Sequence, residues 1–327
     1  MRAALVTEFG PPSSLVIEDV PDLVPGPGEV VIEVGAVSIN FPDILVVEGT
    51  YQNLPPRPFV PGKEAAGRVI AVGEGVDRIT VGQRVLTLVE FGGYAEQVVV
   101  PEALAVELPD SMSYEEAAAF GLVASTAHLG LFRRGHVRPG ETVLVTGAGG
   151  GVGSAAVQLA KARGARVIAL AQDGIKGELA RRQGADLVLT STAETLRDDL
   201  LAATDGNGVD VVLDMLGGDL LTQIIRATAW EGRIVIVGFA SGSQSPIKPG
   251  HILVKNISVV GLQSSDYHDR NPELMRSTLA EIFGLFDQGR INAAVDITFP
   301  LDKVADALQY VKDGKVKGKV VVTTGLG

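Results

Sequence analysis

The segment from Thr142 to Lys161 constrains the fold more than any other part of the chain. Its first five residues are apolar or β-branched, which is typical of a parallel strand buried on both faces. Five glycines then occur within residues 147–153, and apolar residues follow at helical spacing from Val152 to Arg163. Such a turn lets the backbone approach a phosphate, to which the helix presents unpaired N–H groups. The segment therefore predicts a site for the pyrophosphate of a dinucleotide.

The glycine pattern departs from G-x-G-x-x-G at its first position, where Ala148 stands. Further strand-like segments follow with short connections, which favours a doubly wound parallel sheet. They cover residues 166–170, 187–190, 209–214 and 232–238. The residues of the turn that we assign to cofactor binding are Ala148, Gly150, Gly151, Val152 and Gly153.

The chain before this segment has a different character. Residues 1–121 contain short alternating stretches broken by proline and glycine, such as Pro25 to Gly28 before Glu29 to Val37. This punctuation predicts all-β structure, most simply a partly closed barrel. After the strand expected at 257–262 the β/α rhythm ends, and we expect the remaining tail to return to the first domain. The predicted domains are therefore 1–121 with 264–327, and 122–263.

Composition excludes several function classes. The net charge of −11 and the isoelectric point near 4.9 argue against nucleic acid as a partner. The absence of cysteine excludes disulfides, thiolate metal sites and thiolate nucleophiles. No start of signal-peptide type and no membrane-length apolar run occurs. We therefore expect a cytoplasmic protein without membrane partners.

The order of these parts resembles the medium-chain dehydrogenase/reductase superfamily, and within it the zinc-free quinone oxidoreductase branch, which is ζ-crystallin-like. The resemblance covers essentially the whole chain. Its most specific part runs from Gly140 to Lys161, and blocks at residues 37–43, 61–67 and 81–85 agree with it. It implies an α/β protein with a GroES-like β-barrel catalytic domain and a Rossmann domain.

The resemblance also implies a site without metal. In zinc-dependent relatives a cysteine stands at the place of Asn40 and a histidine at the place of Lys63, and a four-cysteine lobe follows the segment near Glu90. This chain has none of these, and neither Asn40 nor Lys63 is a plausible zinc ligand. Its four histidines show no metal-type spacing. Alcohol oxidation through a Lewis acid is therefore not expected.

The choice between NADPH and NADH depends on the end of the second strand of the sheet. An acidic residue there would bind the ribose 2′-hydroxyl of NADH, but the position falls at about Ala171. Lys176 follows, with Arg181 and Arg182 on the same helix, and these cations could pair with a 2′-phosphate. Asp173 is the opposing residue, because it could still reach the ribose. We predict NADPH, with NADH as the less favoured alternative and a solvated helix face as the alternative for Arg182.

Further cofactor contacts are implied by the resemblance alone. Thr126 is expected to contact the nicotinamide end, and Asp214 to Gly217 to pass beneath the adenine or ribose. Gly238 and Phe239 are expected to line the cofactor channel. Lys319 matches a basic residue that relatives bring to the pyrophosphate, and an ordinary strand-edge lysine is the alternative.

Three side chains are implied to serve the substrate. Asn40 is expected to hydrogen-bond a substrate carbonyl or the nicotinamide ribose. Tyr51, in the element Gly49-Thr50-Tyr51, is expected to sit over the nicotinamide and donate a hydrogen bond or a proton, or else to pack the wall of the site. Asp43 is expected to fix the loop, and a cap on the short helix after Asn40 is the alternative.

These residues predict an NADPH:quinone oxidoreductase that transfers hydride to a quinone or similar electron-poor carbonyl acceptor without metal. The sequence lacks G-x-S-x-G, Walker and H-E-x-x-H motifs. A 2-enoyl reductase is the alternative, because there a tyrosine at the place of Tyr51 delivers the proton. A protein that binds NADPH without turnover is a third alternative. By resemblance we expect a homodimer through the strand at 257–262.

Overall fold

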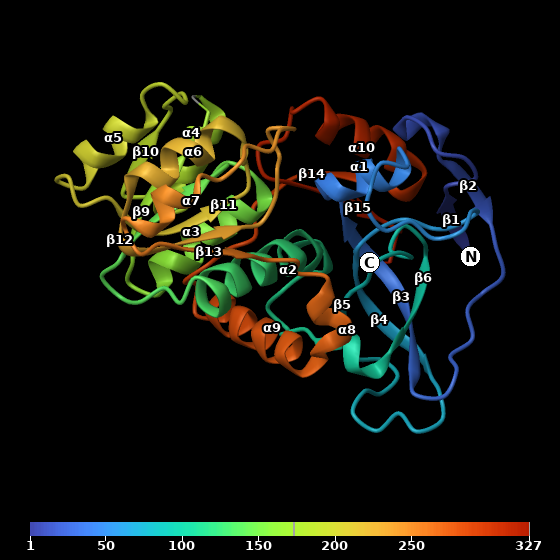
Figure 1. Cartoon of the computed structure of the whole chain (residues 1–327). Coiled ribbons are helices and arrows are strands. Elements are labelled where there is room, and N and C mark those ends of the chain that lie inside the picture. Colours follow the sequence, from blue (N-terminus) through green and yellow to red (C-terminus); the bar gives the residue numbers. More distant parts are fainter. Residues whose placement is uncertain (173, 327) are drawn as a thin grey trace. The chain divides into compact units, whose positions relative to one another are not determined.

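The structure is a computed structural model that describes residues 1–172 and 174–326 (Figure 1). It divides into two compact units, hereafter unit 1, which contains Met1–Leu122 and Ser265–Gly327, and unit 2, which contains Val123–Ser264. The predicted domain boundaries lie one residue from these. The prediction about Asp173 concerns a position outside the described residues.

Unit 1 contains most of the strands. They are β1 (Arg2–Leu5), β2 (Val16–Asp19), β3 (Glu29–Ser38), β4 (Glu64–Val72), β5 (Arg84–Leu88), β6 (Gln97–Pro101), β7 (Ala105–Glu107), β14 (Val295–Pro300) and β15 (Lys319–Thr323). Its helices are α1 (Phe41–Val47), α8 (Asp266–Arg270), α9 (Pro272–Asp287) and α10 (Val304–Lys312), with short 3-10 turns η1 (Pro12–Ser14), η2 (Glu102–Leu104) and η4 (Leu301–Lys303).

The long strand β3 organises the main sheet of unit 1. The sheet has seven strands in the order β14-β15-β3-β4-β5-β7, and β6 also pairs with β3. One end of β3 pairs with β6 through Glu29 to Glu33, and its other end pairs with β15 through Ala36 to Ser38. The tail of the chain thus completes the N-terminal sheet. This arrangement places Asn40, which follows β3, beside the start of β15.

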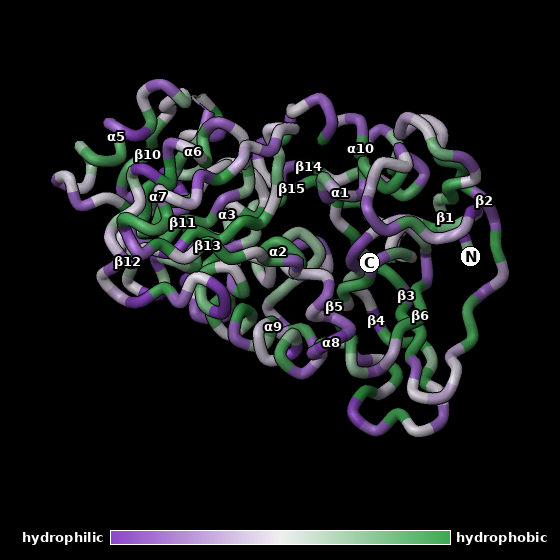
Figure 2. The backbone as a smooth tube through the Cα atoms, viewed as in Figure 1, coloured by the Kyte–Doolittle hydropathy of each residue, from purple (hydrophilic) through white to green (hydrophobic). Residues whose placement is uncertain are grey.

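Apolar side chains explain why these strands pack together. Val30, Ile32 and Val34 alternate along β3 and are fully buried, together with Val85 of β5 and Val322 of β15. Figure 2 shows hydrophobic colour along β3 and β6. Such an apolar face must be covered by other elements, which fixes the register of each strand.

Unit 2 alternates strands and helices. Its strands are β8 (Thr142–Thr146), β9 (Arg166–Leu170), β10 (Leu187–Leu189), β11 (Val209–Asp214), β12 (Thr228–Ile236) and β13 (Ser258–Gly261). Its helices are α3 (Gly151–Ala162), α4 (Ile175–Arg182), α5 (Leu196–Ala203), α6 (Gly218–Ala227), α7 (Pro249–Leu253) and the π-helix η3 (Leu129–Arg134), and α2 (Tyr114–His128) runs from unit 1 into unit 2.

The sheet of unit 2 is parallel throughout and has the order β10-β9-β8-β11-β12-β13. Helix α3 packs against β8 and β9, and α6 packs against β11 and β12 (Figure 1). The strand order reverses at β8, because the chain first builds β9 and β10 on one side and then β11 to β13 on the other. This confirms the predicted combination of a GroES-like domain and a Rossmann domain.

Some elements lie outside the predicted segments. The short strands β2 and β7 were not expected, and β12 begins at Thr228 instead of Gly232. The pairing of β12 with β11 shifts register between Val209 and Val211, and Glu231 has a φ of 57°. This irregularity hides the first half of β12 from a pattern of alternating residues. Among the described helices, none is long and apolar enough to cross a membrane.

Candidate functional site

The glycine-rich turn joins β8 to α3 as a tight backbone loop. Gly147 has a φ of 59°, and its carbonyl accepts a hydrogen bond from the Gly150 N–H at 2.9 Å. Gly150 is the N-cap residue of α3 and has no side chain that could cap the N–H groups of the first helical turn. Gly150, Gly151 and Val152 are at least partly exposed. An anion can therefore reach the N–H groups and the positive dipole end of α3.

Gly153 is required by close packing inside this turn. A Cβ at Gly153 would lie 2.3 Å from the Gly147 carbonyl oxygen and 2.7 Å from Ala148 Cα. Both are backbone atoms, so they could move aside only if the turn itself moved. Ala148 is fully buried, and its N–H is bonded to the Leu170 carbonyl at 3.1 Å. The alanine thus occupies a position where its methyl group packs inward.

Gly149 brings a cation to the same turn. A Cβ at Gly149 would lie 2.5 Å from Lys176 Cβ and 2.9 Å from Lys176 Cα. The missing side chain therefore lets the first turn of α4 approach the glycine loop. Lys176 is partly exposed there, whereas Arg181 and Arg182, further along α4, are exposed.

Asp214 anchors the two central strands of unit 2. Its carboxylate accepts hydrogen bonds from the Thr146 hydroxyl at 2.7 Å, the Leu216 N–H at 3.1 Å and the Gly217 N–H at 3.1 Å. Asp214 is fully buried, and burial raises its pKa above the ordinary value, against the effect of these hydrogen bonds. This side chain holds the ends of β8 and β11 together.

The turns after β11 and β12 are also joined. The Asp214 carbonyl accepts the Val237 N–H at 2.8 Å, and a Cβ at Gly217 would lie 2.8 Å from the Phe239 ring. Phe239 is 43% exposed, so part of its ring remains open. Gly238 has room around its Cα, where the nearest atom to an added Cβ is 3.7 Å away.

Four predicted cofactor segments therefore lie at one edge of the sheet. They follow the carboxyl ends of the neighbouring strands β9, β8, β11 and β12 (Figure 1). This edge includes the point where the strand order reverses, which is where open α/β sheets bind ligands. Thr126 lies on α2, is 6% exposed and donates its hydroxyl to the Ser264 hydroxyl at 3.1 Å. Its contact with the nicotinamide stays a prediction.

A buried polar cluster in unit 1 holds Asn40 from both ends of its amide. Lys319 Nζ donates to Asn40 Oδ1 at 2.7 Å, and Asn40 Nδ2 donates to Glu64 Oε1 at 2.9 Å. Glu64 also accepts from the Ser38 hydroxyl and the Leu122 N–H. Burial raises the pKa of Glu64 and lowers the pKa of Lys319, while the charge of each acts against the shift of the other.

This network fixes the side-chain orientation of Asn40. Lys319 also donates to the Ile39 carbonyl at 3.0 Å and is 7% exposed. These two buried partners within unit 1 favour the alternative interpretation of Lys319 as a strand-edge lysine. Its contact with a pyrophosphate stays a prediction.

Asp43 closes the start of α1. Its Oδ2 accepts the Asn40 N–H at 2.8 Å and the Tyr94 hydroxyl at 2.8 Å. Burial raises the pKa of Asp43 to about 6, although both hydrogen bonds and the Lys63 and Lys319 ammonium groups act in the opposite direction. Asp43 is thus placed as a helix-capping and loop-fixing residue.

Tyr51 follows α1 and is partly exposed. Its N–H donates to the Leu45 carbonyl at 3.1 Å, and the Lys63 ammonium lies 4.5 Å from the centre of its ring. Lys63 itself is 5% exposed and pairs with Glu90 at 2.9 Å. Asn40, Asp43 and Tyr51, predicted from separate positions, are therefore connected in unit 1 through α1 and its flanking residues.

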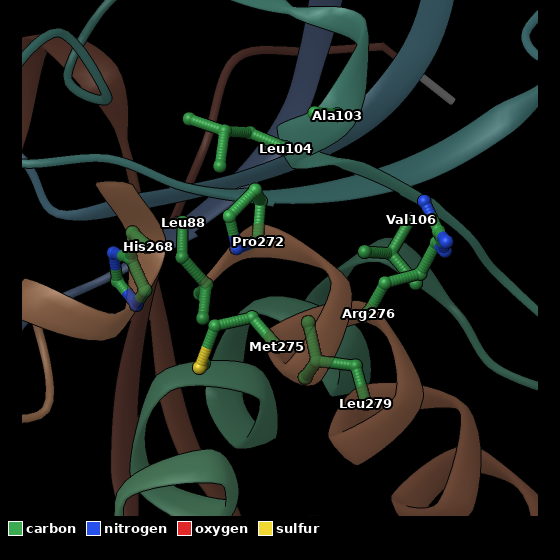
Figure 3. A pocket seen from close by; sticks show the side chains of 9 residues that line it. All are labelled: Leu88, Ala103, Leu104, Val106, His268, Pro272, Met275, Arg276 and Leu279. Atoms are coloured by element: carbon green, nitrogen blue, oxygen red, sulfur yellow. The ribbon is translucent and has the colours of Figure 1, made fainter. Parts of the chain in front are cut away.

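A small apolar hollow lies elsewhere in unit 1, beside α9. Figure 3 shows the His268 ring next to Leu88 and Met275 at one end of it. His268 is 5% exposed, and neither ring nitrogen has a hydrogen-bond partner among the described residues. Burial lowers the pKa of His268 below its ordinary value, against the charges of Glu90 and Asp269.

Comparison with known proteins gives this arrangement a family. Residues 26–110 match the family described as alcohol dehydrogenase GroES-like domain, and residues 151–281 match the family described as zinc-binding dehydrogenase. The quinone oxidoreductase-like protein 2 homolog of Nematostella vectensis is 38% identical over 329 residues, which cover 99% of this chain and 89% of that protein. The chain belongs to the quinone oxidoreductase branch of the medium-chain dehydrogenase/reductase superfamily. It is an oxidoreductase of this superfamily.

Two other members extend the comparison. The quinone oxidoreductase of Rattus norvegicus is 31% identical, with 98% of this chain and 97% of that protein covered. The structure of mycobacterial Rv1454c complexed with NADPH superposes with a TM-score of 0.91 at 33% identity, and covers 99% of this chain and 100% of that one. In the chain studied, no group of three or more histidine, aspartate or glutamate side chains among the described residues is placed to hold a metal ion.

Three residues of the site, Glu64, Tyr94 and Glu90, had no predicted role in the sequence analysis of the chain. Their contacts in the structure place them there: Glu64 binds Asn40, Tyr94 binds Asp43 and Glu90 binds Lys63. Glu64 carried a signal in the sequence, because it is a charged residue directly before the apolar run of a buried strand. Tyr94 and Glu90 carried none.

Proposed function

We propose that the protein is an NADPH-dependent reductase that transfers a hydride to a quinone or a similar electron-poor carbonyl compound. The glycine turn carries this proposal, because the spaces at Gly149 and Gly153 are too tight for a side chain and the α3 N-terminus beside them is uncapped. That fits a pyrophosphate. The names of the relatives and the NADPH complex of the mycobacterial protein support the same choice.

The residues of unit 2 bind and orient the coenzyme in this proposal. The first N–H groups of α3 hydrogen-bond the pyrophosphate, and Lys176, brought to the turn by Gly149, pairs with the 2′-phosphate. No acidic side chain stands at Ala171, where it would select NADH. When bound, NADPH supplies a hydride from C4 of its nicotinamide.

The residues of unit 1 serve the acceptor. The Asn40 amide is held by Lys319 at Oδ1 and by Glu64 at Nδ2, and Nδ2 also donates to the Ser38 hydroxyl at 3.4 Å, so in this proposal it contributes a fixed polar wall. The Tyr51 hydroxyl makes no hydrogen bond to any described residue and can donate one to an acceptor oxygen. Little more is needed for a quinone, because the hydroquinone anion is stabilised by resonance and takes its protons from water.

The decisive experiment measures NADPH oxidation by the purified protein with 1,4-benzoquinone, 9,10-phenanthrenequinone and crotonyl-CoA. We expect turnover with the quinones, and Tyr51→Phe to lower it by less than about tenfold. If crotonyl-CoA is reduced instead, and Tyr51→Phe lowers that rate by about 10² or more, the protein is an enoyl reductase that needs a general acid. Tyr310→Phe is the matched control, because Tyr310 is partly buried and packs against Phe299 beside the core of unit 1.

Binding measurements complete this test. We expect titration to show tighter binding of NADPH than of NADH. NADPH binding without oxidation by any acceptor would favour the non-catalytic alternative. Failure to bind either coenzyme would refute the proposal as a whole.

We also propose that unit 2 forms a homodimer through β13. Among the described strands of unit 2, β13 lies at the edge of the sheet and has β12 as its one neighbour. Trp230, Leu253 and Val254 are 66%, 77% and 73% exposed. The Glu231 N–H donates to the Lys255 carbonyl at 2.8 Å, which brings these apolar side chains to one region of unit 2. An open strand edge beside exposed apolar residues is suited to a two-fold interface.

A further inference from the structure

Lys63 stands out because it is a buried ammonium with few partners. Lysine is almost never buried unless its charge is paired. Lys63 is only 5% exposed, so its ammonium needs partners inside the protein. Its Nζ lies 2.9 Å from Glu90 Oε2 and 3.5 Å from the Glu90 carbonyl oxygen. One strong hydrogen bond therefore holds this ammonium from one side.

Two aromatic rings complete its surroundings. The Lys63 Nζ lies 4.5 Å from the centre of the Tyr51 ring and 5.5 Å from the centre of the Phe91 ring. Both distances are within the range where a cation is attracted by the negative face of an aromatic ring, and burial strengthens that attraction. The ammonium thus uses ring faces in place of the water it has lost.

Tyr51 has little else to hold its side chain. It follows the end of α1, and residues 52–58 form no helix or strand. Its hydroxyl makes no hydrogen bond to a described residue, so its ring contact with Lys63 is what orients it. A side chain held by its ring keeps the hydroxyl available for a ligand.

We propose that Lys63 is a positioning residue for Tyr51: Glu90 anchors its ammonium, and the ammonium holds the Tyr51 ring in the orientation that serves the acceptor. The inference rests on the proposed function, because it assigns Lys63 to the same reaction. Lys63 acts through the ring of Tyr51 and contacts no reacting atom.

Steady-state kinetics with a quinone test this role. Lys63→Met keeps the length of the side chain and removes its charge, and we expect kcat/KM for the quinone to fall by about tenfold. Lys63→Arg keeps a cation that can stack on the ring and bond Glu90, so we expect it to retain activity within about threefold. Lys312→Met is the control, because it removes a partly exposed ion pair with Glu48 in the same unit.

A double-mutant cycle separates positioning from a general structural effect. Tyr51→Phe removes the hydroxyl that the orientation serves, so Lys63→Met should lower kcat/KM by less than about threefold in that background. Tyr51→Leu removes the ring, so Lys63→Met should then have less than about a twofold effect. A loss of about tenfold that persists in both backgrounds, together with a lower melting temperature, would overturn the inference and assign Lys63 to stability alone.

A readout without turnover keeps this inference separate from the proposed function. The chain has five tyrosines, so ring carbon signals of ¹³C-labelled tyrosine can be assigned one by one with Tyr→Phe variants. We expect Lys63→Met to shift or broaden the Tyr51 signal and to leave the other tyrosine signals in place. If the signal responds but no acceptor is reduced, the proposed function fails and the ring contact stands. An unchanged Tyr51 signal would overturn the positioning role.

Discussion

The carboxyl group of Asp43 gives a quantitative prediction about stability. Its pKa is raised from 3.8 to about 6 by burial. Both of its hydrogen bonds end on Oδ2, whereas Oδ1 is buried without a hydrogen-bond partner among the described residues. Asp43→Asn can keep both hydrogen bonds on its amide oxygen and removes the buried charge. The difference in the free energy of unfolding between the two proteins should then vary with pH only through the charge of Asp43.

The sign follows from proton binding. The folded state holds the Asp43 proton up to about pH 6, whereas the unfolded chain releases it near pH 3.8. The contribution of Asp43 to stability is therefore complete below pH 3.8 and is lost as the pH rises through 6. At about 1.4 kcal/mol for each pH unit, the full loss is about 3 kcal/mol, of which about 2 kcal/mol falls between pH 4.5 and 8.

Urea unfolding of both proteins from pH 4.5 to 8, followed by circular dichroism, measures this difference. We expect Asp43→Asn to gain about 2 kcal/mol relative to the parent protein over that range. Glu64 and Lys319 are present in both proteins, so their own titration cancels to first order. The single tryptophan, Trp230, lies in unit 2, and its fluorescence serves as a control for the unit without the substitution. A difference that stays constant with pH, or changes in the opposite direction, would refute the assignment of a desolvated carboxyl group.

Two further predictions concern unit 2. Gly153→Ala should weaken NADPH binding by at least about tenfold, because its Cβ would meet backbone atoms of the turn, whereas Gly250→Ala has open space around it and should bind normally; equal affinities by titration would contradict the tight turn. Trp230→Glu with Leu253→Glu should yield a monomer in sedimentation velocity where the parent protein is a dimer, since a charge there opposes burial of the apolar surface; a parent protein that is already monomeric would rule out the proposed interface.

The fold was largely predictable because its signals are local. The strand at Thr142 to Thr146, the glycine turn and the helix after it follow one another along the chain, so their periodicity identifies them directly. The short strands β2 and β7 have three or four residues and carry too few alternations for the same treatment. The family resemblance extended the prediction to the complete two-domain order.

The candidate site was predictable only in part. The glycine turn, Asn40, Asp43 and Tyr51 could be named, because residue type and order mark them. The roles that their neighbours play could not be named. Glu64 and Lys319 act on Asn40 through contacts that no local pattern describes, and Lys319 lies 279 positions away.

The sequence by itself determined the succession of strands and helices and the glycine turn, because these depend on residues that are neighbours along the chain. Only the tertiary structure decided that Tyr94 binds Asp43, that Lys63 lies against Tyr51 and that burial raises the pKa of Asp43 to about 6. Solvent exclusion and the distance between charges set these properties, and both arise only when segments far apart in the chain are packed together.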